Sequence, residues 1–375
     1  MFWLKPKSYL GVDIGAGGIK LVELKQEKKR PVLFTYGLTS EKHDVHKLNL
    51  AKENNLVDLG KPAEKIEITE PVSEDKVEKY SRMLKGVYSA AKAEAKSAVV
   101  SLPVSSVFHA LVTLPVVNKD ELDRMIRAEV KKLLPMPLEE MALDYQVLKE
   151  EKEKKSQRIL VNAVGHEIIN FYSKIFQKAG LTLEALEPES AALSRCLIGK
   201  DQAVTMVIDI GAERTNFFIN DQGIPITHQT IESGGNKVDK LLQNILGLEA
   251  DLVEQAKYDF FAYINQGKQT IISEKKFLDL FIPVIDPIMK EIGISLEIFL
   301  RQEGNENKRP EKIVITGGMG FLPFLTKYIS DTFKIKSFIG DPWGRVVYQD
   351  GLRPVLRQIG PRMSVAIGLA LRNMI

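Results

Sequence analysis

A short phrase that occurs twice limits what this chain can fold into. Residues 12–16 are Val-Asp-Ile-Gly-Ala, and residues 208–212 are Ile-Asp-Ile-Gly-Ala. An apolar run precedes each copy, and a second strand-like run follows it after a few small or polar residues. This pattern predicts a β-strand, a tight glycine turn and a returning strand. The same hairpin is therefore expected at two places in an α/β protein.

The residue types in the repeated phrase suit the binding of a phosphate chain together with a metal ion. Glycine lets the backbone approach a bulky anion, and the N–H groups of successive turn residues can bind it. A carboxylate at each turn, Asp13 or Asp209, fits if Mg²⁺ lies between it and the phosphates, because Mg²⁺ is typically bound by one or two carboxylates and phosphate oxygens. Lys20 adds a positive charge. One copy alone is also typical of an ordinary strand end, whereas two matching copies favour a metal–nucleoside triphosphate held from both sides.

A third glycine cluster, Gly317-Gly318-Met319-Gly320, follows an apolar strand at residues 312–316. Glycines there would let a flat ring such as adenine lie against the backbone. An ordinary turn between that strand and a helix over residues 321–333 is the alternative. A dinucleotide-binding fingerprint fits less well, because Lys20 stands where its third glycine belongs and a strand follows instead of a helix.

Composition is that of an ordinary soluble globular protein and argues against several functions. The 375 residues suffice for two domains, and 44% of them are apolar. A net charge of +3 is too small to indicate nucleic-acid binding. The single cysteine, Cys196, excludes an internal disulfide and fits a reducing compartment. No segment has the ~20 apolar residues of a membrane span, no signal peptide is expected, and the apolar cluster at residues 1–7 is expected to pack onto the domain.

Between the two copies the pattern changes to that of a small α+β unit. A helix capped by Asn118 lies among four strand-like segments, in the order strand–strand–helix–strand–strand. This order indicates a subdomain inserted into a larger domain. The four segments are residues 98–103, 107–115, 143–148 and 158–164.

Several helices are expected outside this unit. Ser73 caps one, the Glu187-Pro188 pair opens another, and one long helix covers residues 276–303. Glu254 and Lys257 share one face of a further helix, where they suit either the ribose and base of a nucleotide or a surface ion pair.

Taken in order, these motifs resemble the actin-like ATPase superfamily over essentially the whole chain. They are the two Asp-Ile-Gly hairpins, the Glu-Pro helix between them, the Gly-Gly-Met-Gly turn and a small-residue helix at the C-terminus. Within the superfamily the chain is similar to the PilM family of type IV pilus assembly. The specific points of similarity are residues 9–24, 101–103, 113–115, 143–148 and 366–372.

The resemblance implies an actin-like ATPase fold, with two lobes around a nucleotide cleft and an inserted small α+β subdomain of the SHS2 type. The implied divisions are a first domain at residues 1–97, 166–200 and 360–375, the insertion at 98–165, a second core at 201–235 and 305–359, and a mostly helical subdomain at 236–304.

The resemblance also implies which residues bind ATP and Mg²⁺. Asp13 and Asp209 would lie near the metal, and Glu187 near the attacking water. Glu254 and Lys257 would reach the ribose and base. The first phosphate loop would contribute Gly15, Ala16, Gly17, Gly18 and Lys20, and the second phosphate loop Gly211, Arg214 and Thr215. The turn before the next helix would contribute Gly234 and Gly235, and the turn on the adenine side Gly317, Gly318, Met319 and Phe321.

The partner that the resemblance implies is a PilN-like inner-membrane protein. Its short cytoplasmic tail would bind a groove between the insertion and the first domain, with residues 98–115 forming part of the wall. Other pilus platform proteins, the assembly motor ATPase and a second copy of the chain are further implied partners. The resemblance places the protein in the cytoplasm, peripheral at the inner membrane, with a role in bacterial motility.

Departures from the family pattern affect the expected ATP turnover. Ala16-Gly17-Gly18 replaces serines that many members carry, and Glu213 puts an acidic side chain at the tip of the second loop. Glu187 is the candidate for positioning the water and no second base supports it, so hydrolysis is expected to be slow or absent. The sequence leaves open the turnover rate, the oligomeric state, the groove residues, the choice between a pilus and a related secretion system, and the role of residues 41–72.

Two other functions use the same core. An FtsA-like division protein normally carries a basic amphipathic helix at its C-terminus for the membrane surface, and residues 372–375 close this sequence without that pattern. A small-molecule kinase would need a catalytic carboxylate at an acceptor pocket between the two phosphate motifs. Asp120, Asp123 and Asp144 lie there on a predicted helix face or strand, not at a glycine-rich loop. An ATP-binding scaffold is therefore the leading hypothesis.

Overall fold

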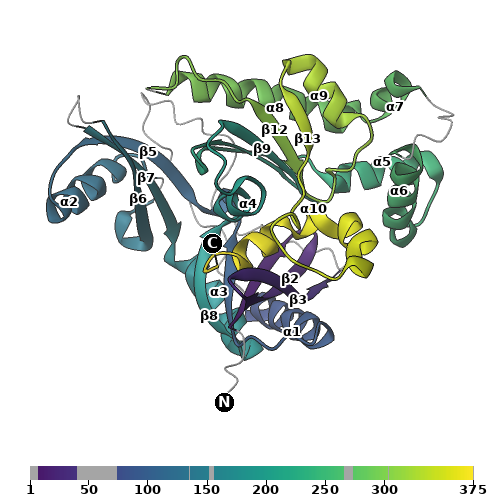
Figure 1. The fold of residues 1–375 in the computed structure, drawn as a ribbon, viewed down its shortest axis with the longest axis horizontal. Helices are drawn as coiled ribbons and strands as arrows, with labels where there is room; N and C mark the ends of the chain where they lie inside the picture. The colour runs from purple at the N-terminus through teal and green to yellow at the C-terminus, as the bar shows by residue number, and fades with distance from the viewer. Residues whose placement is uncertain are drawn as a thin grey trace.

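A computed structural model describes residues 7–39, 74–134, 136–151, 156–265, 273–302 and 304–374 of the chain. The apolar cluster at residues 1–6, the predicted cap Ser73 and the segment 41–72 lie outside these ranges. Two five-stranded sheets and one three-stranded sheet make up the β-structure of the described residues (Figure 1).

The two larger sheets repeat one topology. Their strand orders are β3-β2-β1-β4-β8 and β11-β10-β9-β12-β13. In each, an antiparallel hairpin contains the repeated phrase, a third strand pairs with its outer edge, and two parallel strands follow on the inner edge. The duplication predicted from the two phrases is therefore confirmed. The strands are β1 Ser8–Gly15, β2 Gly18–Glu27, β3 Arg30–Leu38, β4 Ser97–Leu102 and β8 Thr182–Pro188, and then β9 Thr205–Ile210, β10 Thr215–Asp221, β11 Ile224–Ile231, β12 Lys312–Thr316 and β13 Lys336–Ile339.

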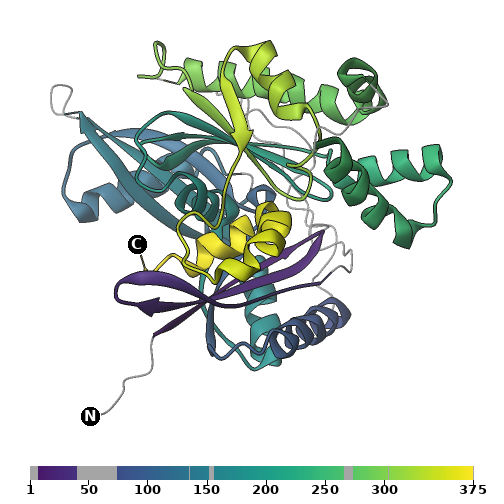
Figure 2. The ribbon, with the colours of Figure 1, turned by 45° about the vertical axis from the view of Figure 1, so that its right-hand side comes forward.

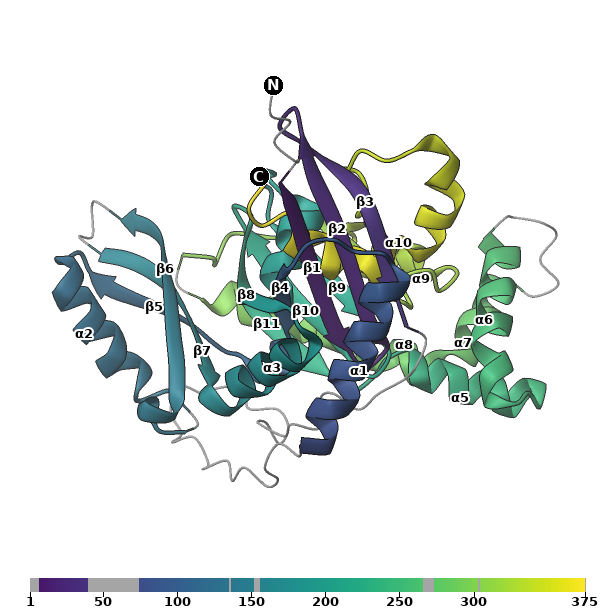
Figure 3. The same cartoon turned by 90° about the horizontal axis from the view of Figure 1, so that it is seen from below.

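Helices cover the outer faces of both sheets. On the first sheet, α1 (Glu74–Ala90) packs against α3 (His166–Ala179) and buries an apolar face that includes Val77, Leu84 and Val87 (Figure 3). On the second sheet, α8 (Ile282–Arg301) packs on β10 and β11. α9 (Leu325–Phe333) contacts β13, while α5 (Gly235–Leu246), α6 (Ala250–Asn265) and α7 (Glu274–Leu280) form the helical region on the right of Figure 1.

The last helix, α10 (Arg353–Ala370), lies between the two larger sheets (Figure 2). It reaches the backbone of its neighbours because two glycines remove side chains from the contact. A Cβ built on Gly11 of β1 would be 2.1 Å from the carbonyl oxygen of Ala366. A Cβ built on Gly368 would be 2.0 Å from that of Ala192, in the short helix α4 (Glu189–Leu193). The small residues of the C-terminal helix are thus explained by close packing.

Alanine substitutions at two helical glycines are expected to change stability in opposite directions. Gly368→Ala should destabilise the protein by about 1–3 kcal/mol, because its Cβ collides with backbone that cannot move easily. Gly293→Ala, in the interior of α8 with nothing within 4 Å of its Cβ, should stabilise it by about 0.5–1 kcal/mol. Urea unfolding of both variants measures the difference, and a stabilised Gly368→Ala protein would show that α10 lies farther from α4.

Three predicted helices differ from those observed. The long helix over 276–303 is two helices, because Pro283 lacks the N–H that a continuous helix needs and instead stands in the first turn of α8. The helix expected from Phe321 begins at Leu325. The helix expected from Glu187 begins at Glu189, since β8 stays paired to β4 through Pro188. Proline is tolerated there because β8 is an edge strand.

The inserted subdomain is smaller than predicted. It consists of β5 (Phe108–Pro115), α2 (Lys119–Val130), β6 (Met141–Glu151) and β7 (Ser156–Gly165), with strand order β5-β7-β6. The predicted cap is confirmed, since Asn118 accepts a hydrogen bond from the Glu121 N–H at 3.0 Å. Residues 98–102 were assigned to the insertion and this is wrong: they form β4, whose Ala98 pairs with Leu10 in the first sheet. The insertion begins after Leu102.

A pair of histidines joins the insertion to the second lobe. His109 of β5 stacks on His228 of β11, with ring centroids 3.7 Å apart and ring planes 7° from parallel. His109 Nδ1 lies 2.7 Å from Asn162 Oδ1, and His228 Nε2 lies 2.9 Å from the Ser190 hydroxyl. Burial lowers the pKa of His109 to about 4, and burial together with His109 lowers the pKa of His228 well below its usual value. Both rings are therefore neutral near neutral pH, as face-to-face contact requires.

Acidification should lower the free energy of unfolding through the titration of this histidine pair. A histidine with a lowered pKa in the folded state contributes stability that is complete above pH 6.5, and that stability is lost as the pH falls toward 4, because the unfolded chain takes up the proton first. The double variant His109→Phe/His228→Phe keeps a ring stack without titrating. Its melting temperature should fall less over that pH range than that of wild type, while the carboxylates common to both proteins cancel in the difference. Parallel pH profiles would contradict the assignment.

Candidate functional site

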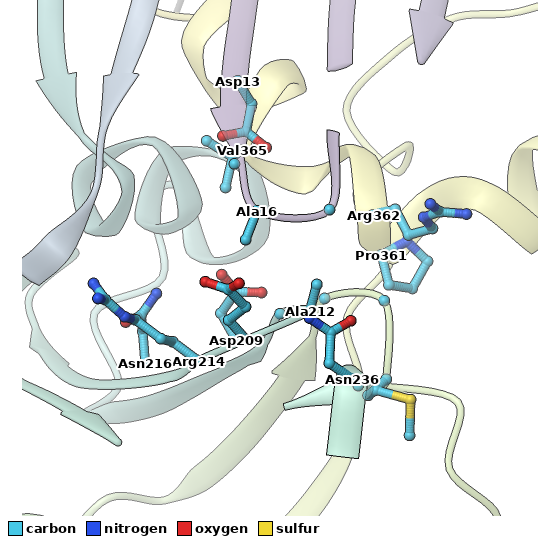
Figure 4. A pocket seen from close by; sticks show the side chains of 18 of the residues that line it. Asp13, Ala16, Asp209, Ala212, Arg214, Asn216, Asn236, Pro361, Arg362 and Val365 are labelled. Atoms are coloured by element: carbon cyan, nitrogen blue, oxygen red, sulfur yellow. The ribbon is translucent and has the colours of Figure 1, made fainter. Parts of the chain in front are cut away.

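A cavity lies between the two lobes, where the two hairpin turns face each other. It encloses about 1030 Å³ of empty space, part of it open to solvent. Residues from both hairpins, from the turn after β12, and from α4, α5, α6 and α10 line it (Figure 4). Clefts in which a few polar groups converge are typical of sites for small ligands and cofactors.

The first hairpin brings a carboxylate and a lysine to the cavity on one strand face. Asp13 of β1 pairs in register with Lys20 of β2, so both side chains project to the same side. Lys20 Nζ donates to Asp13 Oδ2 at 3.0 Å, and the hydroxyl of Ser101 donates to the other carboxylate oxygen at 2.8 Å. Gly15, Ala16 and Gly17 also line the cavity. Gly18 has φ +101° and turns the chain against Thr39 instead.

The second hairpin repeats this arrangement with an amide in place of the lysine. Asp209 of β9 pairs in register with Asn216 of β10, and both line the cavity with Gly211 and Arg214. The turns of the two hairpins are close, since a Cβ on Gly17 would be 3.4 Å from that of Ala212.

Thr215 and Gly234, which were predicted to contact the nucleotide, instead pack against the backbone around the second hairpin turn. The Thr215 hydroxyl donates to the Ser233 carbonyl at 2.6 Å. A Cβ on Gly234 would be 2.7 Å from the Gly211 carbonyl oxygen, so Gly234 allows the backbone to pack there. Neither residue lines the cavity.

Three of the carboxylates that line the cavity, Asp13, Asp209 and Glu189, lie close enough together to disfavour one another's charge. Burial, followed by the nearby Asp13, raises the pKa of Asp209 to about 6, although Lys20 and a hydrogen bond from Asn216 oppose this. Burial, Asp13 and Asp209 raise the pKa of Glu189 well above its usual value. Lys20 therefore offsets the repulsion among these three carboxylates only in part. Across the described ranges no group of three or more His, Cys, Asp or Glu side chains is arranged to hold a metal ion; a Mg²⁺ that shares its ligands with phosphate needs only one or two carboxylates.

The structure places Glu189, and not Glu187, in the cavity. Glu187 ends β8 and pairs with Arg195, whose Nη1 lies 3.1 Å from its Oε2. Glu189 begins α4, accepts a hydrogen bond from the Asn216 amide at 3.2 Å and another from the Val104 N–H. The Glu-Pro-Glu sequence contains both residues. Because β8 continues to Pro188, Glu189 enters the cavity and Glu187 does not.

The far end of the cavity is built by α5, α6, α10 and the turn after β12. Glu254 and Lys257 both line it, and each is paired: Lys257 Nζ lies 2.6 Å from Asp239 Oδ1, and Arg362 Nη1 lies 3.2 Å from Glu254 Oε1. The Arg362 guanidinium also lies over the ring of Tyr258, 5.8 Å from its centroid.

The glycine turn at this end allows close approach. Gly317 has φ +87°, and a Cβ there would be 2.5 Å from Asp209 Oδ1. Gly318 and Met319 line the cavity, and a Cβ on Gly235, which also lines it, would be 3.0 Å from Met319 Cγ. Phe321 does not line the cavity.

Several lining residues were not predicted. The strand register could have indicated Asn216, which stands opposite Asp209 as Lys20 stands opposite Asp13. The others come from distant elements that only the fold brings together, so no local pattern marks them. They are Pro103, Val104, Ser105, Glu189, Asn236, Asp239, Tyr258, Pro361, Arg362 and Val365.

Two duplicated α/β lobes that hold a glycine-turn cavity between them define an actin-like ATPase fold. The family model for type IV pilus assembly protein PilM matches residues 11–374, and the chain belongs to that family. The fold is similar to that in the PilM–PilN type IV pilus biogenesis complex, with a TM-score of 0.74, 23% identity and 98% of each chain covered. It is also similar to ethanolamine utilization protein EutJ from Carboxydothermus hydrogenoformans, with a TM-score of 0.51, 16% identity, and 98% of this chain and 91% of that chain covered. None of the helices in the described ranges is both long and apolar enough to cross a bilayer.

Replacing Asp209 with Asn is expected to stabilise the ligand-free protein above about pH 6. A carboxyl whose pKa is raised from 3.8 to about 6 costs stability as the pH rises through that range, because the folded state disfavours its charge. Asparagine keeps the shape without ionising, so a gain of about 1–2 kcal/mol at neutral pH is expected. Urea unfolding compares it with Asp279→Asn, an exposed control on α7. A destabilised Asp209→Asn protein would show that the carboxylate is needed for the ligand-free fold.

Proposed function

We propose that this chain binds Mg–ATP between its lobes and links a PilN-like inner-membrane protein to the type IV pilus machinery, with slow or absent ATP hydrolysis. The observation that carries the proposal is the cavity in which two glycine turns face each other and Asp13, Asp209 and Glu189 lie close together beside Lys20. Such a site attracts a cation, and the turn N–H groups attract the phosphates that the cation would accompany.

Different residues of the cavity would contact the metal ion, the phosphates and the base. Asp13 and Asp209 would hold Mg²⁺, which when bound supplies positive charge against the phosphate oxygens. Lys20 would contact the phosphates, and Arg214 stands at the end of the cavity where the terminal phosphate would lie. The guanidinium of Arg362, at the opposite end in Figure 4, offers a flat cationic surface for the base.

Glu189 is the carboxyl placed to contact the attacking water. Burial, Asp13 and Asp209 raise the pKa of Glu189 well above its usual value in the ligand-free protein, which disfavours the charged form that could accept a proton from water. Turnover would then depend on the bound cation lowering that pKa. This supports a nucleotide-binding scaffold in preference to a fast ATPase.

The partner proposal rests on family membership and on the insertion. The protein of similar fold in the PilM–PilN complex assembles with PilN. In the present chain the insertion leaves the first lobe after β4 and returns at α3, and the residues that follow β4, Pro103–Ser105, line the cavity. We propose this junction as the groove for the cytoplasmic tail, which would hold the protein at the inner membrane through its partner.

Calorimetric titration tests both parts. Wild type should bind Mg–ATP and a synthetic PilN-type cytoplasmic tail peptide. Arg362→Ala should weaken Mg–ATP about 5-fold but leave Mg–tripolyphosphate unchanged, because only ATP has a base to stack. Arg353→Ala, exposed in the first turn of α10, is the control. Absence of Mg–ATP binding would end the nucleotide proposal, and absence of peptide binding with ATP still bound would end the partner proposal.

A further inference from the structure

The inserted subdomain belongs to the first lobe by chain connection but contacts the second lobe. One contact is the His109–His228 stack between β5 and β11. Another is a hydrogen bond from Arg214 Nη1, in the second hairpin turn, to the hydroxyl of Ser105. Opening or closing of the cleft therefore cannot leave the insertion unaffected.

Ser105 lies in the one-turn 3₁₀ helix Val104–Ser106, which leads from β4 into the insertion. Val104 and Ser105 line the cavity together with Arg214 and Glu189, and the Val104 N–H bonds to the Glu189 carboxyl. The entry to the insertion is thus a wall of the proposed nucleotide site. Arg214 is about one-fifth exposed, and its Nη2 is 3.9 Å from the well-exposed carboxylate of Glu232.

Arg362 and Arg214 stand on opposite sides of the cavity in Figure 4. A nucleotide with its base at Arg362 and its phosphates between the hairpin turns would direct its last phosphate toward Arg214. A phosphate offers a guanidinium an opposite charge and two oxygens for bidentate bonding, neither of which a neutral hydroxyl offers. A third phosphate would therefore outcompete Ser105, whereas a diphosphate would not reach far enough to do so.

Resting on the proposed function, we propose that Arg214 exchanges Ser105 for the terminal phosphate of ATP and thereby releases the insertion from the second lobe. With ADP the Arg214–Ser105 bond holds the entry helix against the second hairpin. With ATP that bond is lost and the histidine stack remains as the pivot. The nucleotide state then sets the position of the insertion, and with it the groove proposed for the partner tail.

Hydrogen–deuterium exchange of the full chain tests this proposal, with Mg–ADP against a magnesium-bound non-hydrolysable ATP analogue. Backbone amides of residues 104–115 should exchange faster with the ATP analogue. Ser105→Ala should exchange fast in both states and should bind ATP about 5-fold more tightly, because it removes the competitor for Arg214. Arg214→Ala should lose the difference between the nucleotides and should bind ATP more weakly. Opposite effects on ATP affinity from the two ends of one hydrogen bond are the signature of competition.

Arg214→Lys provides a second variant, because it keeps the charge and loses the planar geometry; it should reduce the ATP–ADP difference without abolishing ATP binding. Arg353→Ala is the control and should behave as wild type. Equal exchange of residues 104–115 with both nucleotides bound, or weaker ATP binding by Ser105→Ala, would overturn the exchange mechanism while leaving nucleotide binding intact. Failure of wild type to bind either nucleotide would overturn the proposed function and this inference together.

Discussion

The close-packed layer between the two large sheets is the constraint on which the rest of the structure depends. One hydrophobic cluster contains Val99 of the first sheet, Phe218 of the second and Leu369 of α10. Gly11 and Gly368 let α10 reach backbone on either side. The layer extends to the cavity itself, where the Pro361 carbonyl in α10 accepts a hydrogen bond from the Gly317 N–H at 3.1 Å. The distance between the two hairpins therefore follows from the packing of one helix.

That packing brings three carboxylates close together, which lowers the stability of the ligand-free protein and is typical of a binding site. Asp13 lies in β1, Asp209 in β9 and Glu189 in α4. Each carboxylate would be better solvated if it lay away from the other two. Their shared burial raises the pKa values of Asp209 and Glu189, which is unfavourable for the ligand-free protein. Stability given up at one cavity in an otherwise well-packed fold is typical of a binding site, because a cation with its phosphates would turn the repulsion into attraction.

Local sequence was sufficient where local geometry decides the outcome. Each Asp-Ile-Gly-Ala phrase predicted its own hairpin, and the strand period places Lys20 opposite Asp13 without any tertiary information. Local sequence was insufficient where pairing with a distant strand decides the structure of a segment. β8 remains a strand through Pro188 because β4 is beside it, which moves Glu187 into an ion pair with Arg195 and leaves Glu189 in the cavity. The same pairing takes residues 98–102 out of the insertion.

By itself, the sequence determined the duplicated hairpins, their glycine turns and the family to which the chain belongs, because short-range backbone preferences and glycine positions specify them. Tertiary structure alone decided the end of the cavity at Arg362 and the junctions of the insertion. Arg362 meets Glu254, and Arg214 meets Ser105, only after α10 and β4 have packed against their sheets. Contacts between elements so far apart in the chain depend on packing geometry, which no local pattern of residues encodes.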